Sequence, residues 1–360
     1  MSLVSLVAEK IADDVRNVVN TPRELAVEAR YAIGAYRRGE LSALQLGRTA
    51  GATAFAVLVV ALLLFPIYWI AMSAISGTGG SVYAAGGFSF FPENPSVQPF
   101  VWVLGDLIVP PLAISLNVPF TELALVFNTP EIAFLDASDH GVDNPSNFKQ
   151  YFVNSVIVSV PTLILAMCVI VPAAYALSRR EFIMRRKVLF GYVLFTQVGG
   201  GLGIASLIAL YAMFVQVGLN NNRLALAAYY AATAVPFNTW LLKTYMDGIP
   251  VSYEEAALVD GAPPWRVVTE IILPLSAAGL ATVTIFTFLT GWMEFVVAQT
   301  MLSADKFTLP VGLFALIDEY SIPWARFSAF ALTFASPVML VYLFAQRYIE
   351  GGLSFSGMEG

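Results

Sequence analysis

Long apolar stretches separated by short polar connections dominate this chain and predict helices that cross a membrane. Six stretches stand out, at residues 50–72, 152–178, 188–215, 224–242, 275–298 and 327–346. A helix rises about 1.5 Å per residue, so each can span most or all of a hydrocarbon core about 30 Å thick. A glycine run at 199–203 inside the third stretch favours close helix packing or a hinge over ligand binding. The pattern predicts an all-α membrane protein with six transmembrane helices.

Composition agrees with this prediction and excludes other classes. Hydrophobic residues make up 58% of the chain and charged residues 12%, against about 45–50% and about 25% in soluble domains. A net charge of −6, with no basic patch, argues against a nucleic-acid partner. One cysteine and one histidine give neither a disulfide framework nor a zinc set, so we expect no metal site.

Residues 73–151, between the first two stretches, contain an apolar run at 101–127 that resembles a seventh span. Basic residues argue against it, because they concentrate in cytoplasmic loops. The loop after the second stretch carries five of them, Arg179, Arg180, Arg185, Arg186 and Lys187. The N-terminal side is basic as well, so 73–151 must add an even number of crossings, and the simplest number is zero. We therefore expect an extracytoplasmic insertion at 73–151, with both termini in the cytoplasm.

These assignments divide the chain into five parts. Residues 1–48 form a cytoplasmic amphipathic segment, for which a surface helix is favoured over a regulatory or docking role. The remaining parts are the first transmembrane helix at 49–72, the insertion at 73–151, a core of five transmembrane helices at 152–349 and a cytoplasmic tail at 350–360. A cytoplasmic loop at about 244–273 lies within the core.

That loop contains the most informative local pattern, at residues 252–275. Ser252 and Glu255 have the spacing of a capping box, which predicts the start of a helix. Gly261 can end that helix, and the Pro263–Pro264 pair can begin another. The sequence predicts two short helices that meet at a bend.

The same residues resemble a family signature. Glu255-Ala256-Ala257, then Gly261, then Leu273-Pro274 resembles the EAA motif of permease subunits in binding-protein-dependent ABC importers. The resemblance implies a type I ABC importer permease fold in a prokaryotic cell membrane, with the bend seated in a cleft of a cytoplasmic ATPase. The ATPase contacts that it implies are Glu254, Glu255, Ala256, Ala257, Leu258, Asp260, Gly261, Ala262 and Trp265.

Weaker resemblances extend from residue 148 to the C-terminus. Residues 152–155 are similar to the F-x-N-S opening of the family's second span, and residues 292–295 to the W-N-E/D-F element of its carbohydrate branch, with Met293 replacing Asn. The tail is similar to that of the second permease of maltose/maltodextrin importers, where Lys commonly stands at the position of Glu359. The resemblance implies a sugar importer with an ATPase dimer, a second permease and an extracytoplasmic binding protein as partners. It also implies ATPase contacts at Gly352, Leu353, Gly357 and Gly360.

No catalytic constellation is present in the sequence. The phosphate-binding G-x-x-x-x-G-K-[ST] loop is absent, so this chain is not the ATPase and we expect no enzyme activity. The resemblance implies that ATP and Mg²⁺ bind to a partner subunit. Glu294 lies inside a predicted span, where a charge costs about 2.5–3.5 kcal/mol. It could line a translocation path or form a structural pair. The candidates for the path are Glu294, Trp292, Phe295, Gln299 and Asn154.

Two other functions remain open on this evidence. An importer of the same architecture for polyamine, phosphate or glycerol phosphate would share the EAA motif. A secondary transporter would need intramembrane ion-coupling groups and usually an internal repeat, and the sequence offers one such carboxylate and no convincing repeat.

Overall fold

The computed structural model describes most of the chain from residue 42 onwards. The described residues are 27, 30–31, 34, 36, 38, 42–77, 90–92, 94–105, 107–109, 113–117, 124–128, 132–135, 141–142, 144–201, 203–317 and 322–356. The chain divides into two units, residues 1–72 and 73–360. The amphipathic segment expected at 1–48 lies mostly outside the described residues and stays a prediction.

Helix α2 (Ala43–Ala74) makes up most of the described part of the first unit. Its side chains are apolar around the whole circumference, and they are exposed from Phe55 to Ile67. An all-round apolar helix is stable in water only if protein covers it, whereas lipid covers it in a membrane. The composition and exposure of α2 therefore fit a transmembrane helix.

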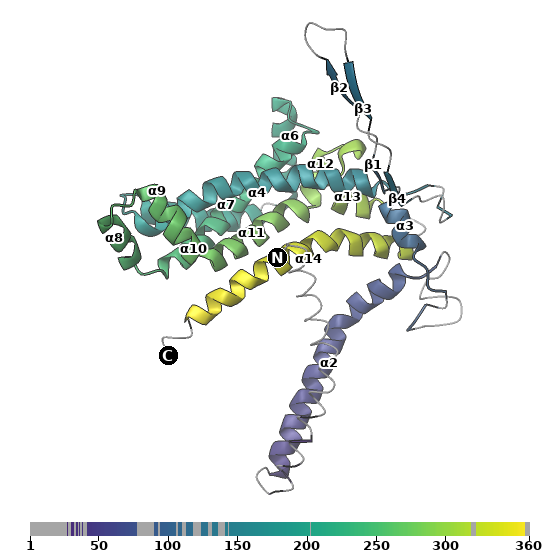
Figure 1. Ribbon diagram of the computed structural model, residues 1–360, viewed down its shortest axis with the longest axis horizontal. Helices are drawn as coiled ribbons and strands as arrows, with labels where there is room; N and C mark the ends of the chain where they lie inside the picture. Colours follow the sequence, from purple (N-terminus) through teal and green to yellow (C-terminus); the bar gives the residue numbers. More distant parts are fainter. Residues whose placement is uncertain are drawn as a thin grey trace. The chain divides into compact units, whose positions relative to one another are not determined.

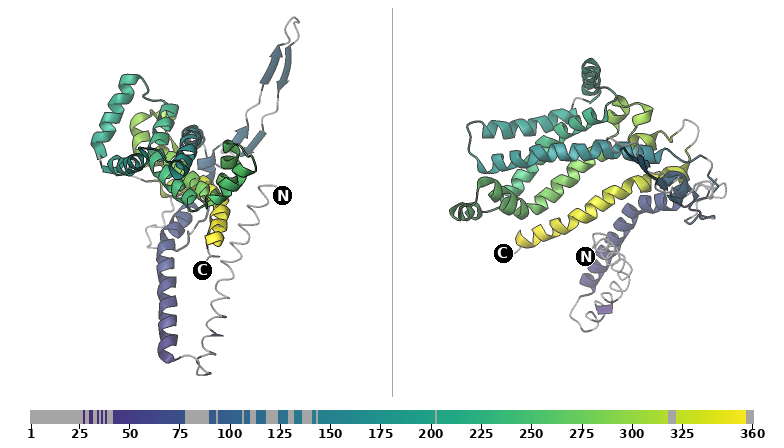
Figure 2. Two further views of the ribbon diagram at one scale, coloured as in Figure 1. Left: turned by 90° about the vertical axis from the view of Figure 1, so that its left-hand side faces the viewer. Right: turned by 45° about the horizontal axis from the view of Figure 1, so that its top comes forward.

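In the second unit, long helices lie side by side (Figures 1 and 2). The helices are α3 (Gln98–Leu104), α4 (Phe148–Arg179), α5 (Arg185–Gly201), α6 (Gly203–Val217), α7 (Arg223–Asp247), α8 (Ser252–Val259), α9 (Pro264–Arg266), α10 (Leu273–Leu275), α11 (Ala277–Trp292), α12 (Val296–Met301), α13 (Leu309–Phe314) and α14 (Trp324–Ser356). A π-helical turn at Val267–Ile272 joins α9 to α10. Helix α4 packs against α7 and α11, and α11 also packs against α7 and α14.

Small residues let these helices approach one another closely. A Cβ atom added to Gly291 of α11 would lie 2.9 Å from the Cα atom of Ser159 on α4. Membrane helices associate largely through such close packing, because lipid removes the hydrophobic drive between them. Larger side chains fill the remaining core, including Ile170 of α4, Leu242 of α7 and Val283 of α11.

Four helical segments among the described residues are long and apolar enough to cross a membrane: Gly47–Ala74, Phe148–Arg179, Ala277–Met301 and Trp324–Gln346. The third predicted span, 188–215, is instead divided into α5 and α6. Gly203 at the division has φ of +49°, in a region that side chains other than glycine rarely adopt. The mostly helical architecture is confirmed, and the number of six crossings stays a prediction.

The described residues of 73–151 that lie between α2 and α4 form short elements, and none of these is a long helix. Helix α3 is followed by four strands, β1 (Leu107–Val109), β2 (Ala113–Asn117), β3 (Ala124–Asn128) and β4 (Ile132–Leu135). β1 pairs with β4 and β2 with β3, both antiparallel, and Ala113 lies opposite Asn128. Helix α3 packs against α14. The apolar run at 101–127 is thus divided between a helix and strands, and its placement outside the cytoplasm stays a prediction.

Candidate functional site

The predicted helix, bend and second helix form a compact element that we call the elbow, residues 252–266. Helix α8 ends at Val259, and Gly261 follows with φ of +83°. The Gly261 N–H donates to the Leu258 carbonyl at 3.1 Å, and the Ala262 N–H donates to the Ala257 carbonyl at 3.0 Å. These two bonds form a Schellman motif, which satisfies the last carbonyls of a helix. Pro264 then begins α9.

The start of α8 differs from the sequence prediction. The expected capping box is wrong, because Val251 is the N-cap residue and no side chain caps the helix. The N–H groups of Glu254 and Glu255 bond to the Val251 carbonyl at 2.9 and 3.1 Å, so the first turn begins one residue earlier. Ser252 is the first helical residue and not the cap.

The inner side of the elbow is fixed to α4 by a buried ion pair. The Glu254 carboxylate accepts from Nε of Arg179 at 2.5 Å and from the Tyr175 hydroxyl at 3.2 Å. Both charged side chains are 9% exposed. Arg179 also donates to the Ile249 carbonyl at 2.7 Å, just before α8. The Glu254 carboxylate is therefore paired inside this chain, and its expected contact with an ATPase stays a prediction.

Ala257 also faces the protein, and its expected contact with an ATPase stays a prediction as well. It is 9% exposed and belongs to the core cluster formed by α4, α7 and α11. Ala262 packs against the same cluster. Glu254 and Ala257 lie three positions apart, on one helix face, so they define the side of α8 that faces the protein.

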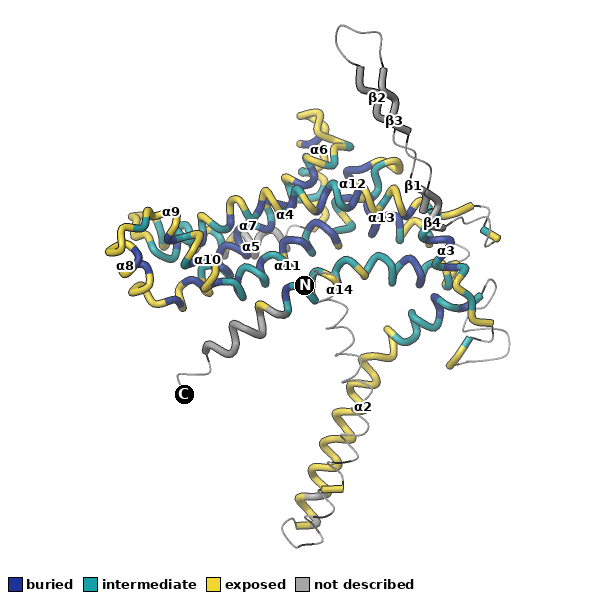
Figure 3. Tube along the Cα trace, viewed as in Figure 1, coloured by how far each residue is buried: buried dark blue, intermediate teal, exposed yellow. Residues whose placement is uncertain are grey.

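The outer side of the elbow is exposed (Figure 3). The exposed predicted residues are Glu255, Ala256, Leu258, Asp260, Gly261 and Trp265. Leu258 is 53% exposed and Trp265 62%. Sequence reasoning missed Tyr253 and Val259, which are 53% and 86% exposed and extend the apolar surface. Both are apolar residues within the motif, and this could have indicated that they belong to the exposed apolar surface.

The predicted translocation residues lie around a break in the bundle. Helix α11 ends at Trp292 and α12 begins at Val296, so Glu294 lies at a break between two helices, inside the apolar segment Ala277–Met301. Its carboxylate accepts from the N–H groups of Val297 at 2.9 Å and Ala298 at 3.1 Å. The Tyr230 hydroxyl on α7 also donates to it. These bonds give Glu294 the structural pairing that the sequence left as one of two alternatives.

Two of the other predicted path residues lie in the core. Trp292 is 2% exposed, and its ring stacks on Phe288 and Phe334 at centroid distances of 5.4 and 6.1 Å. Asn154 is also 2% exposed. Its amide donates to the carbonyls of Asp305 and Phe307 and accepts from Arg223. Both side chains are thus buried in this structure, and their expected place on a translocation path stays a prediction.

Phe295 and Gln299 lie elsewhere at the break. The Phe295 ring packs against Phe314, with centroids 4.9 Å apart. Gln299 is exposed on α12. The five predicted path residues therefore do not form one surface.

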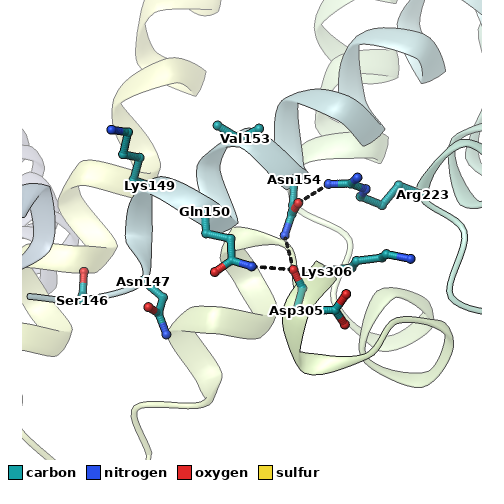
Figure 4. Close-up of a pocket in the computed structure, with 9 residues that line it drawn as sticks. All are labelled: Ser146, Asn147, Lys149, Gln150, Val153, Asn154, Arg223, Asp305 and Lys306. Carbon is teal, nitrogen blue, oxygen red and sulfur yellow. Dashed lines mark hydrogen bonds between the residues drawn. The ribbon is translucent and has the colours of Figure 1, made fainter. Parts of the chain in front are cut away.

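A polar cavity of about 630 Å³ lies at the start of α4 (Figure 4). Lys149, Arg223 and Lys306 line it together with Asp305. Lys306 Nζ donates to the Asn221 carbonyl at 2.9 Å, and Gln150 donates to the Asp305 carbonyl at 2.7 Å. The cavity is at the end of α4 opposite the elbow.

The predicted C-terminal contacts are only partly described. Gly352 and Leu353 lie within α14. Gly357 and Gly360 lie outside the described residues. All four stay predictions.

Comparison with known proteins decides the family. Residues 150–354 match the family model described as "Binding-protein-dependent transport system inner membrane component". The chain belongs to this family. The match includes α4 through most of α14 and therefore the whole elbow, so the resemblance found in the EAA pattern is confirmed.

Similar members of the family are transport permeases. The inner membrane ABC transporter permease protein YcjP of Escherichia coli (strain K12) is 34% identical over 227 residues, covering 62% of this chain and 80% of the relative. The maltose/maltodextrin transport system permease protein MalG of Photorhabdus laumondii is 30% identical over 309 residues, covering 84% and 92%. The diacetylchitobiose uptake system permease protein NgcG of Streptomyces coelicolor is 36% identical over 215 residues, covering 58% and 69%.

A solved structure shares the fold. It is a bacterial ABC transporter involved in the import of the acidic polysaccharide alginate, with a TM-score of 0.62 at 20% identity. The likeness covers 86% of this chain and 98% of that chain. Family and fold together make this protein a transport permease subunit of the cell membrane that crosses it several times.

The bonds of Glu294 lead to a first prediction. Glu294→Ala removes the acceptor for two N–H groups at the start of α12, and loss of such a cap costs about 0.5–2 kcal/mol. We expect a lower melting temperature of the purified chain. Glu294→Gln keeps an acceptor oxygen and should retain most of the stability.

Transport by the glutamine variant separates the two roles of Glu294. If Glu294 has only a structural role, uptake by Glu294→Gln should be close to that of the unsubstituted chain, after correction for the amount of protein in the membrane. A large loss of uptake at unchanged melting temperature would contradict the structural role and return Glu294 to the translocation path.

Proposed function

We propose that this chain is a permease subunit of an ABC importer that translocates a sugar. Its partners would be an ABC ATPase dimer that carries ATP and Mg²⁺, a second permease and an extracytoplasmic binding protein. The sugar assignment is supported by the similarity to permeases named for maltose/maltodextrin and diacetylchitobiose transport. The carbohydrate-type element at residues 292–295 supports it as well.

We further propose six crossings with both termini in the cytoplasm. Helices α5 and α6 together, and α7, would supply the two crossings beyond the four apolar helical segments. The basic residues at the end of α4, at the start of α5 and in the loop between them would then lie in the cytoplasm, in agreement with the positive-inside rule. The elbow lies at the same end of α4, because Glu254 pairs with Arg179.

The proposed coupling role rests on one observation: the elbow has an exposed apolar side and an opposite side that is fixed to the bundle. Tyr253, Leu258, Val259 and Trp265 expose apolar surface next to the acidic Glu255. Exposed apolar patches in a folded protein commonly mark binding sites for other proteins. The opposite side is held by a buried ion pair and by core packing. An ATPase that docks on the outer side would therefore move the elbow and the end of α4 together.

The polar cavity at the other end of the bundle is suited to the extracytoplasmic partner. Lys149, Lys306 and Asp305 all line it, and the Lys306 and Asp305 side chains lie on the same side of the cavity (Figure 4). Charged groups on an interface rim guide association and register. We propose that this face, with the insertion at 73–151, receives the loaded binding protein.

A docking measurement tests the coupling role. Val259→Asp places a charge in the apolar surface without touching the core, since Val259 is 86% exposed. We expect co-purification of the ATPase to fall about tenfold, as is typical when a central interface residue costs more than about 1.4 kcal/mol. Glu255→Arg should act in the same direction through reversed charge.

Val97→Asp is the matched control. Val97 is 65% exposed and directly precedes α3, away from the elbow. Val97→Asp should leave the recovery of the ATPase unchanged when equal amounts of the two variants are present in the membrane. Full ATPase recovery with Val259→Asp would refute docking at the elbow.

The solute class needs a separate experiment. Uptake into vesicles that contain the complete transporter should be driven by a binding protein loaded with a maltodextrin or another sugar. Polyamine, phosphate and glycerol phosphate serve as comparison solutes. Transport of one of these with no sugar transport would overturn the sugar assignment and leave the coupling role intact.

A further inference from the structure

A second cavity, of about 670 Å³, lies between α5 and α7. Its position is at the elbow end of the bundle, because α4 ends at Arg179, α5 begins at Arg185, and Lys243 lies in the last turns of α7. The lining combines two kinds of side chain. Three are basic, Arg186, Lys187 and Lys243, and four are large and apolar, Ile183, Leu189, Phe190 and Trp240.

The charge of this cavity is not fully compensated. Lys243 forms an ion pair with Asp247, one turn further along α7. The Asp247 carboxylate also accepts from the Ser178 hydroxyl at 2.7 Å. Within the described part of the chain, Arg186 and Lys187 are exposed and have no acceptor. A ligand in this cavity would therefore meet two available positive charges.

Arg185, the basic residue next to Arg186, has a structural role instead. Arg185 donates to the carbonyls of Leu177 and Ser178 at 2.8 and 3.2 Å, so it caps the end of α4. Structural capping accounts for Arg185 but not for Arg186 and Lys187. These two side chains are free to contact an anion.

The apolar wall limits the choice of anion. Ile183 is 103% exposed, Phe190 64% and Trp240 44%. A small soluble anion would use only the basic side chains and leave these surfaces in water. An amphiphile would cover both, with its charged head on the basic side chains and its hydrocarbon on the apolar ones. Tryptophan and basic side chains are both enriched where a membrane protein meets the headgroup layer.

We propose that this cavity binds an anionic phospholipid, with Arg186 and Lys187 on the headgroup phosphate and the acyl chains along Ile183, Phe190 and Trp240. Basic pockets between transmembrane helices on the cytoplasmic side are suited to acidic headgroups. The inference needs a chain embedded in a membrane with this end at the surface. It does not depend on ATPase docking at the elbow, so the two proposals can fail separately.

The experiment uses the purified full chain in mild detergent. Photoactivatable phosphatidylglycerol and phosphatidylcholine are compared by native mass spectrometry and by mapping of the crosslinked peptides. We expect selective retention of phosphatidylglycerol, with crosslinks at residues 183–190 and 240–243. Arg186→Gln/Lys187→Gln should weaken that retention by about tenfold, as expected for removal of two basic contacts to an acidic headgroup.

The matched control is Arg180→Gln/Lys149→Gln, which removes two exposed basic residues that do not line this cavity. It should leave retention unchanged. Equal loss in the control would mean diffuse attraction, and competition by inorganic phosphate would mean a soluble ligand. Loss of the crosslinks on addition of the ATPase or the second permease would mean a protein contact. Each of these results overturns the proposal, and crosslink mapping on the unsubstituted chain decides the site even if the double variant does not fold.

Discussion

Glu254→Ala is expected to abolish coupled uptake while the chain remains in the membrane. The substitution leaves Arg179 charged and only 9% exposed, without its carboxylate partner. Removing one partner of a buried ion pair costs about 3–5 kcal/mol. The Ile249 carbonyl still accepts from Arg179, so we expect the lower end of that range. The elbow would then be detached from α4, and uptake should fall at least about tenfold.

A double variant separates the effect of losing the ion pair from the effect of leaving the Arg179 charge buried without a partner. Arg179→Met/Glu254→Leu replaces the pair with apolar side chains, a change that is often neutral or stabilising for buried pairs. We expect its melting temperature to return close to that of the unsubstituted chain. The measurements are thermal unfolding in detergent and uptake at matched membrane level.

An exposed ion pair in the same region supplies the control. Arg266 and Glu270 are 3.0 Å apart, and their side chains are 51% and 56% exposed. Breaking such a pair with Glu270→Ala should change stability by less than about 0.5 kcal/mol. Normal uptake by Glu254→Ala would show that the buried pair does not transmit movement.

Gly261→Val is expected to uncouple ATP hydrolysis from uptake. A Cβ atom at Gly261 meets nothing within 4 Å, so no side-chain clash is involved. The difficulty is the backbone, because φ is +83° and a left-handed conformation costs other residues about 1–2 kcal/mol. Relief of that strain breaks the Schellman motif and changes the angle between α8 and α9. ATPase activity of the reconstituted complex should persist while uptake falls.

Gly218 provides an unusually close control. It has φ of +73° and open space around it. The N–H groups of Gly218 and Leu219 bond to the carbonyls of Val215 and Phe214, which is the same terminal motif. It lies at the opposite end of α7 from the elbow. Gly218→Val should lower stability by a similar amount without uncoupling, and equal uncoupling by both variants would remove the special role of the bend.

Local rules allowed the elbow to be predicted from sequence. The left-handed conformation at Gly261 and the start of α9 at Pro264 depend on the backbone freedom of one residue and the fixed φ of another. These effects act within a few positions of the chain. The membrane class follows from composition in the same direct way, since apolar length does not depend on how the helices pack.

Contacts between distant residues decided the rest. Glu254 and Glu255 are adjacent and chemically alike, yet one is buried against Arg179 and the other is exposed. Arg179 is 75 positions away in the chain, so no local pattern separates the two carboxylates. Apolar surroundings likewise placed Glu294 in a span, and only the fold shows that the helix is broken there and that the carboxylate bonds to Tyr230 and to the start of α12.

By itself, the sequence determined a helical membrane protein with a bend at Gly261, because apolar length and backbone chemistry are properties of short segments. The permease assignment came from the resemblance of that bend to the EAA motif. The tertiary structure alone decided that Glu254 anchors the elbow, that Trp292 and Asn154 belong to the core, and that Arg186 and Lys187 line an open cavity. Burial and pairing depend on which helices meet, and that is set by packing over the whole bundle.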